Sequence, residues 1–224
     1  MCNLYSNTTA VEAMRSLFKV APGDNHLGNA EPLTAIWPKY YGHVVRLDKN
    51  GARELVSLSW GFRTTKVSKK TGKTLQPAAW NNARDDKVRS VGLWRESFHK
   101  RRCLLPGASF CEAKGRSPAT YYWFGLRGDG PRPPFAFAGM WTRSSFDGPE
   151  GQDECETYTM ITTTANELVK PVHPDRMPVI LRPCDYEQWL NGSVEDAHEL
   201  LRPYPADDMR IIKSGEDERQ DEGL

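Results

Sequence analysis

Long apolar runs are missing from the sequence, and so is any paired-cysteine motif of the form C-x-x-C. The mean hydropathy of the whole chain is -0.64. No segment of the sequence approaches the roughly 20 consecutive apolar residues that a membrane-spanning helix needs. The first eight residues, MCNLYSNT, have neither a basic start nor an apolar stretch, which argues against a secretory signal. The five cysteines are odd in number, so neither a disulfide framework nor a structural zinc site is expected. We therefore expect a protein of the reducing cytoplasm without a membrane partner.

Neither sign of charge is in large excess, but the charges are unevenly distributed. The 30 basic and 29 acidic residues give a net charge of +1. Residues 63–73 hold five cations and no acid, residues 100–102 form a second basic cluster, and residues 215–224 are acidic. The basic segments fit contact with nucleic-acid phosphates. They also fit a solvated loop, which is the more common outcome for such a run.

The length and the apolar pattern predict one α+β domain. A chain of 224 residues with 38% hydrophobic residues suits a single buried core. Thr9 and Glu12 have the spacing of a capping box, and Asn50-Gly51 between two apolar runs predicts a β-hairpin. The expected helices cover residues 9–20 and 92–99 and two segments that begin at Pro183 and at Gly192-Ser193; the expected strands cover residues 43–47, 54–60, 103–113, 120–127, 135–142, 156–163 and 179–181.

These elements predict a domain over residues 1–214, built on an antiparallel sheet with a barrel-like core and flanking helices. Residues 61–80 are expected to form a basic loop. The acidic residues 215–224 are expected to be a frayed tail. No internal repeat or linker divides the chain, and we expect a monomer that needs no cofactor or metal.

Cys2 directly follows Met1, and its small side chain permits removal of that methionine. Removal would leave a free α-amine and a thiol on one residue. The α-amine has a pKa of about 7.7–8.0, so an appreciable fraction is neutral at pH 7. The amine can attack an aldehyde to form an imine, and the thiol can then close a five-membered thiazolidine ring. A cysteine at position 2 is more often only a small residue at a disordered start, so this interpretation needs supporting residues elsewhere.

Five segments farther along the chain supply a recognisable order and spacing. They are Trp60-Gly61, Asn82-Ala-Arg84, Arg102-Cys-Leu-Leu-Pro-Gly-Ala-Ser-Phe-Cys-Glu112, Ala138-Gly-Met-Trp141 and Pro171-Val-His-Pro-Asp-Arg-Met-Pro-Val-Ile-Leu181. Together with Cys2 they resemble the SRAP family, whose members are called SOS-response-associated peptidases or abasic-site processing proteins. The resemblance runs from Cys2 to about Trp189.

The resemblance implies an α+β fold with a groove for single-stranded DNA and a covalent crosslink to abasic sites, made in the DNA damage response. In the family, the cysteine matching Cys2 forms the crosslink, and the asparagine matching Asn82 orients the terminal amine. The glutamate matching Glu112 acts as acid and base, and the histidine matching His173 assists opening of the deoxyribose ring.

Arg84 and Arg176 match family positions that are expected to meet DNA phosphates. Taken alone, each would more often be solvated or salt-bridged. The chain also departs from the family pattern, which commonly begins M-C-G-R, because Leu4 stands where the family has an arginine that meets phosphate. Around Glu112 the family has F-Y-E-W, whereas residues 110–113 read FCEA. These departures concern affinity for DNA more than the reaction.

The residue types suit the implied chemistry. An abasic sugar is mostly a closed hemiacetal, so a histidine near its ring oxygen can help as a proton donor. Imine formation expels water, for which a partly buried Glu112 with a raised pKa could shuttle protons. Asn82 can accept a hydrogen bond from the amine without adding charge. Without the resemblance, Asn82 and His173 would be interpreted as turn residues and Glu112 as a surface carboxylate.

Two other functions use the same features. An N-terminal-nucleophile cysteine peptidase or amidase would use an exposed Cys2, and any self-cleavage would remove only Met1. A non-catalytic single-stranded DNA-binding module would bind intact and abasic strands alike, with strong salt dependence. The crosslinking and the binding functions both predict a location at the nucleoid.

Overall fold

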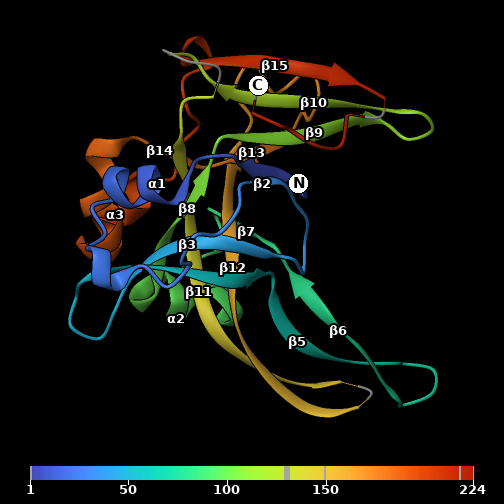
Figure 1. Cartoon of the computed structure of the whole chain (residues 1–224). Coiled ribbons are helices and arrows are strands. Elements are labelled where there is room, and N and C mark those ends of the chain that lie inside the picture. The colour runs from blue at the N-terminus through green and yellow to red at the C-terminus, as the bar shows by residue number, and fades with distance from the viewer. Residues whose placement is uncertain (1, 129–131, 149, 217, 224) are drawn as a thin grey trace.

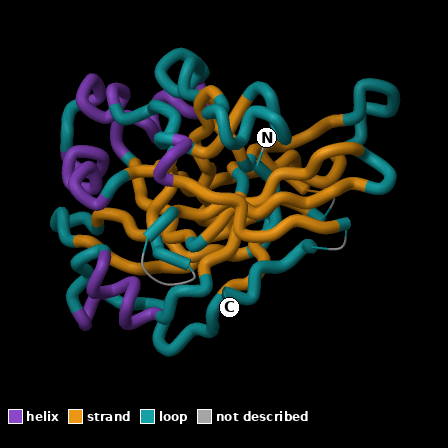
Figure 2. Tube along the Cα trace, turned by 90° about the horizontal axis from the view of Figure 1, so that it is seen from above, coloured by secondary structure: helices purple, strands orange, loops and turns teal. Residues whose placement is uncertain are grey.

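The computed structural model describes residues 2–128, 132–148, 150–216 and 218–223. The helices gather at one side of the molecule, and long β-hairpins project from the opposite side (Figures 1 and 2). The amino-terminal end of the chain lies between two of these projections (Figure 1). Among the described residues, no helix combines the length and the apolar character that crossing a membrane requires.

A closed ring of strands forms the centre of the fold. Its members are β3 (Tyr41–Leu47), β4 (Arg53–Trp60), β8 (Arg102–Gly107), β11 (Phe135–Gly148) and β12 (Gly151–Thr164). The order β12-β4-β3-β8-β11 closes because β11 also pairs with β12. All neighbours in the ring are antiparallel except β4 and β12, which run parallel. The predicted barrel-like core and the predicted hairpin at Asn50-Gly51 are therefore confirmed.

A second, open sheet packs beside the barrel and carries the amino-terminal strand. Its order is β15 (Met209–Gly215), β10 (Ala119–Leu126), β9 (Ser109–Gly115), β1 (Tyr5–Asn7) and β2 (Leu33–Ile36). β1 pairs antiparallel with β9, with Tyr5 opposite Phe110 and Ser6 opposite Ser109. A run that was predicted as one strand over residues 103–113 is divided at Ala108 between β8 and β9. The division lets one segment serve both sheets.

Four helices and three short strands complete these layers: α1 (Val11–Leu17), α2 (Gly92–Lys100), α3 (Tyr186–Asn191), α4 (Val194–Glu199), β7 (Asn82–Arg84), β13 (Arg176–Pro178) and β14 (Ile180–Leu181). The predicted helix at 92–99 and the two closing helices are confirmed, and Ser193 caps α4 with Asp196. The predicted capping box at Thr9 is wrong, because α1 follows Ala10 and has no side-chain cap. Glu12 instead pairs with Arg15.

Residues 61–80 form a hairpin rather than the predicted loop. β5 (Phe62–Val67) and β6 (Thr74–Trp80) pair antiparallel, and Gly72 with a φ of +69° helps turn the chain between them. Thr64, Thr65 and Val67 are β-branched residues that favour an extended backbone despite the intervening lysines. We call this β5–β6 hairpin the basic arm.

The acidic tail, which was predicted to be frayed, is docked at Asp221. Asp221 is fully buried, and its carboxylate accepts hydrogen bonds from Arg132 Nη2 at 2.8 Å and Ser109 Oγ at 2.5 Å. Ser6 Oγ donates to the same carboxylate at 3.3 Å. The tail therefore ties β1 to β9. Hydrogen bonds to a charged carboxylate hold the tail, and its acidic composition therefore did not indicate this docking.

Candidate active site

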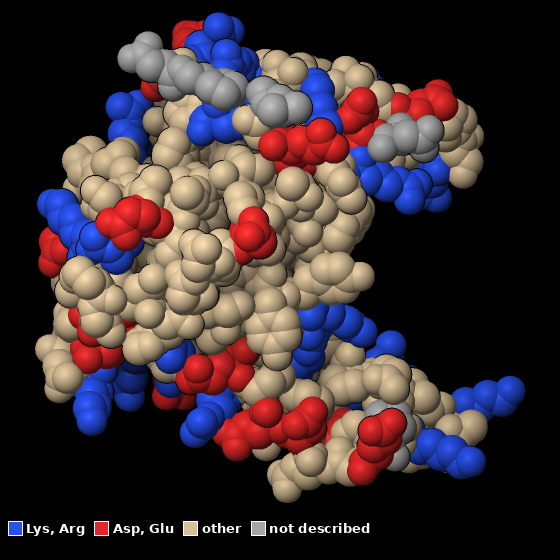
Figure 3. Space-filling model, viewed as in Figure 1, with Lys and Arg blue, Asp and Glu red and all other residues tan. Residues whose placement is uncertain are grey.

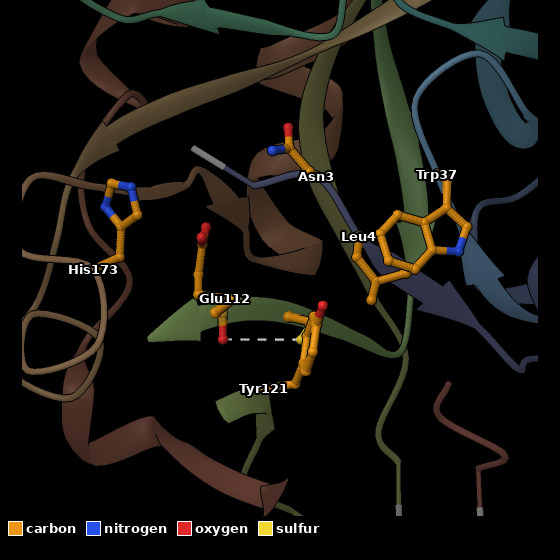
Figure 4. A pocket seen from close by; sticks show the side chains of 8 residues that line it. Asn3, Leu4, Trp37, Glu112, Tyr121 and His173 are labelled. Carbon is orange, nitrogen blue, oxygen red and sulfur yellow. Dashed lines mark hydrogen bonds between the residues drawn. The ribbon is translucent and has the colours of Figure 1, made fainter. Parts of the chain in front are cut away.

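A cavity of about 340 Å³ opens beside the amino-terminal segment. Asn3 and Leu4 precede β1, Glu112 comes from β9, Tyr121 from β10, and His173 from the loop between β12 and β13. The Glu112 side chain rises from β9 toward the amino-terminal segment, with His173 on one side and Leu4 and Trp37 on the other (Figure 4). Residues that lie far apart in the sequence thus meet around one concave space.

Cys2 lies next to this cavity, at the start of the segment that leads into β1. It is only 1% exposed, and its thiol donates to the carbonyl of Leu4 at 3.4 Å. Burial, followed by the charge of Glu112, raises the pKa of the Cys2 thiol well above its usual value. The exposed cysteine that was expected is therefore buried, and it is held as a thiol.

Two neighbouring amides hold Cys2 in place. The Nδ2 groups of Asn81 and Asn82 donate to its carbonyl oxygen at 3.2 Å and 2.7 Å. Asn81 also donates to the side chain of Asn3 at 2.9 Å. The Oδ1 atom of Asn82 is buried without a hydrogen-bond partner among the described residues. A buried acceptor left open beside Cys2 is costly for stability and suits a donor that arrives later.

Glu112 is a buried carboxyl on the wall of the cavity. It is 5% exposed, and its Oε1 has no hydrogen-bond partner among the described residues. Burial raises the pKa of Glu112 to about 7. Near neutral pH the group can therefore both accept and give a proton, which is the property that general acid–base catalysis requires.

His173 faces the cavity from the loop between β12 and β13. The backbone N–H of Arg176 donates to its Nδ1 at 3.2 Å. Because Nδ1 accepts, the neutral ring carries its proton on Nε2. Burial lowers the pKa of His173, which favours this neutral form at physiological pH. The neutral imidazole can donate a hydrogen bond from Nε2.

The two arginines expected at phosphates differ in their surroundings. The Arg84 side chain is 53% exposed and forms a bidentate pair with Asp86, with both N–O distances 2.9 Å. Arg176 is only 9% exposed; it pairs with Asp85 at 2.7 Å and bonds the carbonyl of Thr162. The structure thus leaves Arg84 near solvent but places Arg176 inside the protein. Arg176 holds the turn that presents His173.

Sequence reasoning missed Asn81, Trp37 and Tyr121. Asn81 bonds Cys2, and the two aromatic residues line the cavity. The available signal for Asn81 was its position directly before Asn82, which the sequence motif had already identified. Nothing in the sequence indicated that Trp37 or Tyr121 would line this cavity, because both positions depend on how the second sheet folds.

The surface is hollowed between the β9–β10 hairpin above and the basic arm below (Figure 3). Lys and Arg side chains lie along both walls of this cleft (Figure 3). On the chain, the exposed cations of the upper hairpin include Lys114 and Arg116, and those of the basic arm are Lys66, Lys69, Lys70 and Lys73. The amino-terminal segment lies between the two (Figure 1). The local charge thus favours an anionic ligand.

Curated relatives share part of this sequence. The abasic site processing protein YoqW of Bacillus subtilis (strain 168) is 37% identical over 135 residues, which cover 59% of this chain and 58% of that protein. The abasic site processing protein YobE of the same organism is 35% identical over 135 residues, which cover 59% of each. The matched region therefore spans a little under three fifths of these relatives.

Solved structures and a family profile cover almost the whole chain. A protein from Bordetella bronchiseptica superposes with a TM-score of 0.70 at 26% identity, covering 96% of this chain and 98% of that one. A protein from Bacteroides thetaiotaomicron has the same fold, with a TM-score of 0.72 at 20% identity over 95% of this chain and 90% of its own. The profile described as "SOS response associated peptidase (SRAP)" matches residues 1–216. This chain therefore belongs to the SRAP family.

Proposed function

We propose that this protein processes abasic sites in single-stranded DNA by forming a thiazolidine crosslink through Cys2. The observation that carries the proposal is a cavity lined by Glu112 and His173, with Cys2 held by Asn82 next to Asn3 on its wall, between basic walls. The names of the curated relatives, which are abasic site processing proteins, support the same substrate. Crosslinking would shield the damaged strand in the DNA damage response, at the nucleoid.

The reaction requires the free α-amine of Cys2, and hence removal of Met1, which lies outside the described residues. The carbonyl of Cys2 is already fixed by two amides. The partnerless Oδ1 of Asn82 can accept a hydrogen bond from the freed amine. Such a bond would orient the nitrogen lone pair toward the cavity and Glu112.

The reaction then consists of ring opening, imine formation and closure of the thiazolidine ring. His173, with its proton on Nε2, assists opening of the deoxyribose hemiacetal to the aldehyde. The Cys2 amine adds to the aldehyde carbon to give a carbinolamine. Glu112 supplies the proton with which the hydroxyl leaves as water, and it takes back the proton that the nitrogen loses, giving an imine. The Cys2 sulfur adds to the imine carbon, and the thiol proton passes through Glu112 to the nitrogen. The net reaction joins aldehyde and cysteine with loss of one water.

Phosphate contacts would come from the surface cations of the cleft. Arg84 is half exposed, and its surface pair with Asp86 is of the kind that contributes little free energy. Exchanging Asp86 for a phosphate oxygen is therefore feasible. Arg176 is instead proposed as a positioning residue for His173, because Asp85 and Thr162 already bind its guanidinium.

Intact-mass measurement tests the proposal directly. The purified protein is incubated with single-stranded DNA that contains one abasic site, and with the same strand reduced to remove the aldehyde. We expect a chain lacking Met1, and an adduct equal to protein plus oligonucleotide less one water, only with the aldehyde. Cys2→Ala should form no stable adduct. An adduct of equal yield in Cys2→Ala would sink the proposal.

The peptidase in the family description is the second candidate function, because it would use the same freed Cys2. A peptidase turns over a peptide substrate without DNA, and the adduct experiment with a peptide in place of the oligonucleotide would reveal it. A simple binding module would bind intact and abasic strands alike and give no adduct with either. The three functions thus give three different mass spectra.

A further inference from the structure

Exposed large hydrophobic side chains are concentrated on one part of the molecule. Among the described residues, seven such side chains are exposed, and five of them belong to the basic arm, to the first residue of β3 or to the turn before it. The five are Tyr40, Tyr41, Val67, Leu75 and Trp80. A soluble surface normally scatters such residues singly, so this grouping indicates a contact surface.

The same segment is strongly basic. Residues 62–84 contain Lys66, Lys69, Lys70 and Lys73 together with two arginines, and they contain no acidic residue. All four lysines are exposed. Exposed aromatic rings interleaved with cations are typical of surfaces that bind single-stranded nucleic acid, where bases stack on the rings and cations meet the phosphates.

Trp80 is the ring best placed to contact the substrate. It is 49% exposed, and its indole N–H donates to Thr64 Oγ1 at 3.0 Å, which fixes the ring on the arm. The next two residues, Asn81 and Asn82, are those that bind the carbonyl of Cys2. The ring is therefore one and two residues away from the amides that hold the reactive residue.

The basic arm is anchored rather than free. The backbone N–H of Arg63 donates to Ser144 Oγ at 3.0 Å, and the N–H of Asp147 donates to Thr65 Oγ1 at 2.8 Å. Both partners lie on β11 of the barrel. Phe62 lies opposite Trp80 and Lys66 opposite Leu75, with an irregularity of the register between the two pairs. The bond from Trp80 to Thr64 places these two side chains on one face of the arm. An ordered face loses little entropy on binding.

We infer that this face of the basic arm binds the nucleotides next to the reacting one, with a base stacked on Trp80 and phosphates held by the lysines. The inference rests on the proposed function for its substrate, a single strand. It adds that affinity resides in an arm that is separate from the reacting residues. Intact strands should therefore bind there as well.

Binding of a fluorescent, intact oligothymidylate tests the arm without any reaction. Trp80→Ala should weaken binding about tenfold, and Trp80→Phe, which keeps a ring, should stay within about twofold of the parent. Lys69→Gln/Lys70→Gln should weaken binding, whereas Lys49→Gln/Lys100→Gln, an equal change of exposed charge elsewhere, should not. An oligonucleotide with a photoactivated 5-iodouracil should crosslink to the peptide that contains Trp80.

The outcomes separate this inference from the proposed function. If Trp80→Ala binds intact strands as the parent does, the arm is not the binding surface, even where the parent crosslinks abasic DNA. If Trp80→Ala loses binding while no abasic strand gives an adduct with the parent, the basic arm is supported as the binding surface and the crosslinking proposal fails. Equal weakening by Trp80→Phe and Trp80→Ala would indicate a damaged hairpin, and it would overturn the stacking assignment.

Discussion

At the scale of single residues, Glu112 shows how the site trades stability for reactivity. Its carboxyl is buried with an open oxygen, and its pKa is raised by burial from 4.5 to about 7. A raised acid pKa means that the folded protein holds the proton more tightly than the unfolded chain does. Between pH 4.5 and 7 the free energy of unfolding therefore falls as pH rises, and above pH 7 the full cost of the buried charge remains.

We expect Glu112→Gln to stabilise the protein at pH 8 by roughly 2–3 kcal/mol, because no charge is then buried. At pH 4.5 the variant and the parent should be nearly equal in stability. Urea unfolding at the two pH values measures the difference. The same variant should crosslink abasic DNA far more slowly. A variant that is equally stable to the parent at both pH values would show that Glu112 is not a buried acid.

Asn82 and Asn81 give a matched pair, since both bond the same carbonyl of Cys2. Only Asn82 has a buried, open oxygen that can orient the freed amine. We expect Asn82→Ala to slow crosslinking roughly 100-fold, because a misplaced reactant costs about that much, and Asn81→Ala to have a smaller effect. Single-turnover rates of adduct formation measure both. Equal losses in the two variants would contradict a special role for Asn82.

Residue motifs predicted Cys2, Asn82, Glu112 and His173 as one site because their order along the chain is recognisable. In the structure Glu112 and His173 line one cavity, and Asn82 bonds Cys2, while the roles of the four residues stay a prediction. Arg176 could not be judged in this way. Its partner Asp85 lies 91 positions earlier in the chain, and the two meet because β12 pairs with both β7 and β13. Sequence patterns report residue type well, but they do not report which guanidinium is already bound.

At the scale of elements, the carboxy-terminal segment acts as a tie between the strands that carry the site. Asp221 bonds Ser6 of β1 and Ser109 of β9. Ser6 is four residues from Cys2, and Ser109 is three residues from Glu112. Burial opposes its charge, but Arg132 and Ser109 lower the pKa of Asp221 overall. A lowered acid pKa stabilises the fold above the unfolded pKa, and this contribution is lost as pH falls.

We expect Asp221→Asn to destabilise the protein by about 3 kcal/mol at pH 7, because it removes the buried charge that pairs with Arg132 and accepts from Ser109. The difference should shrink toward pH 3, where the parent also loses the charge. Thermal unfolding across this range measures it. Glu222→Gln, an equal change in charge on the same segment, serves as control and should have little effect. A pH-independent difference would show that shape and not charge ties the strands.

The elements that local patterns predicted correctly are those whose signals are short-range: the Asn50-Gly51 hairpin, α2, and the Ser193 cap of α4. The basic arm was wrongly predicted as a loop, and the docking of Asp221 was not predicted, because both depend on distant partners. Ser144 and Asp147 anchor the arm, and Ser6, Ser109 and Arg132 anchor the tail. In both segments, polar contacts replace the apolar periodicity on which sequence interpretation relies.

At the scale of the whole molecule, the net charge of +1 conceals a strongly divided surface. Basic side chains line the cleft (Figure 3), whereas acids such as Asp153 and Glu154 lie on the outer hairpin of β11 and β12. At about 0.1 M salt, charges separated by more than about 10 Å are largely screened from each other. A strand in the cleft therefore responds to the local cations and not to the molecular total.

The lysines of the basic arm should control how binding depends on salt. On single strands, each neutralised phosphate contributes about -0.7 to the slope of log affinity against log salt. Replacing Lys66, Lys69, Lys70 and Lys73 by Gln should therefore make that slope shallower by up to about 2.8, whereas Trp80→Ala should lower affinity with the slope unchanged, because stacking releases no counterions. Titrations of intact oligothymidylate at several salt concentrations separate the two contributions. A quadruple variant with the parental slope would mean that the lysines face solvent in the complex, and the cleft charge would then have to act through Arg84 and the β9–β10 hairpin.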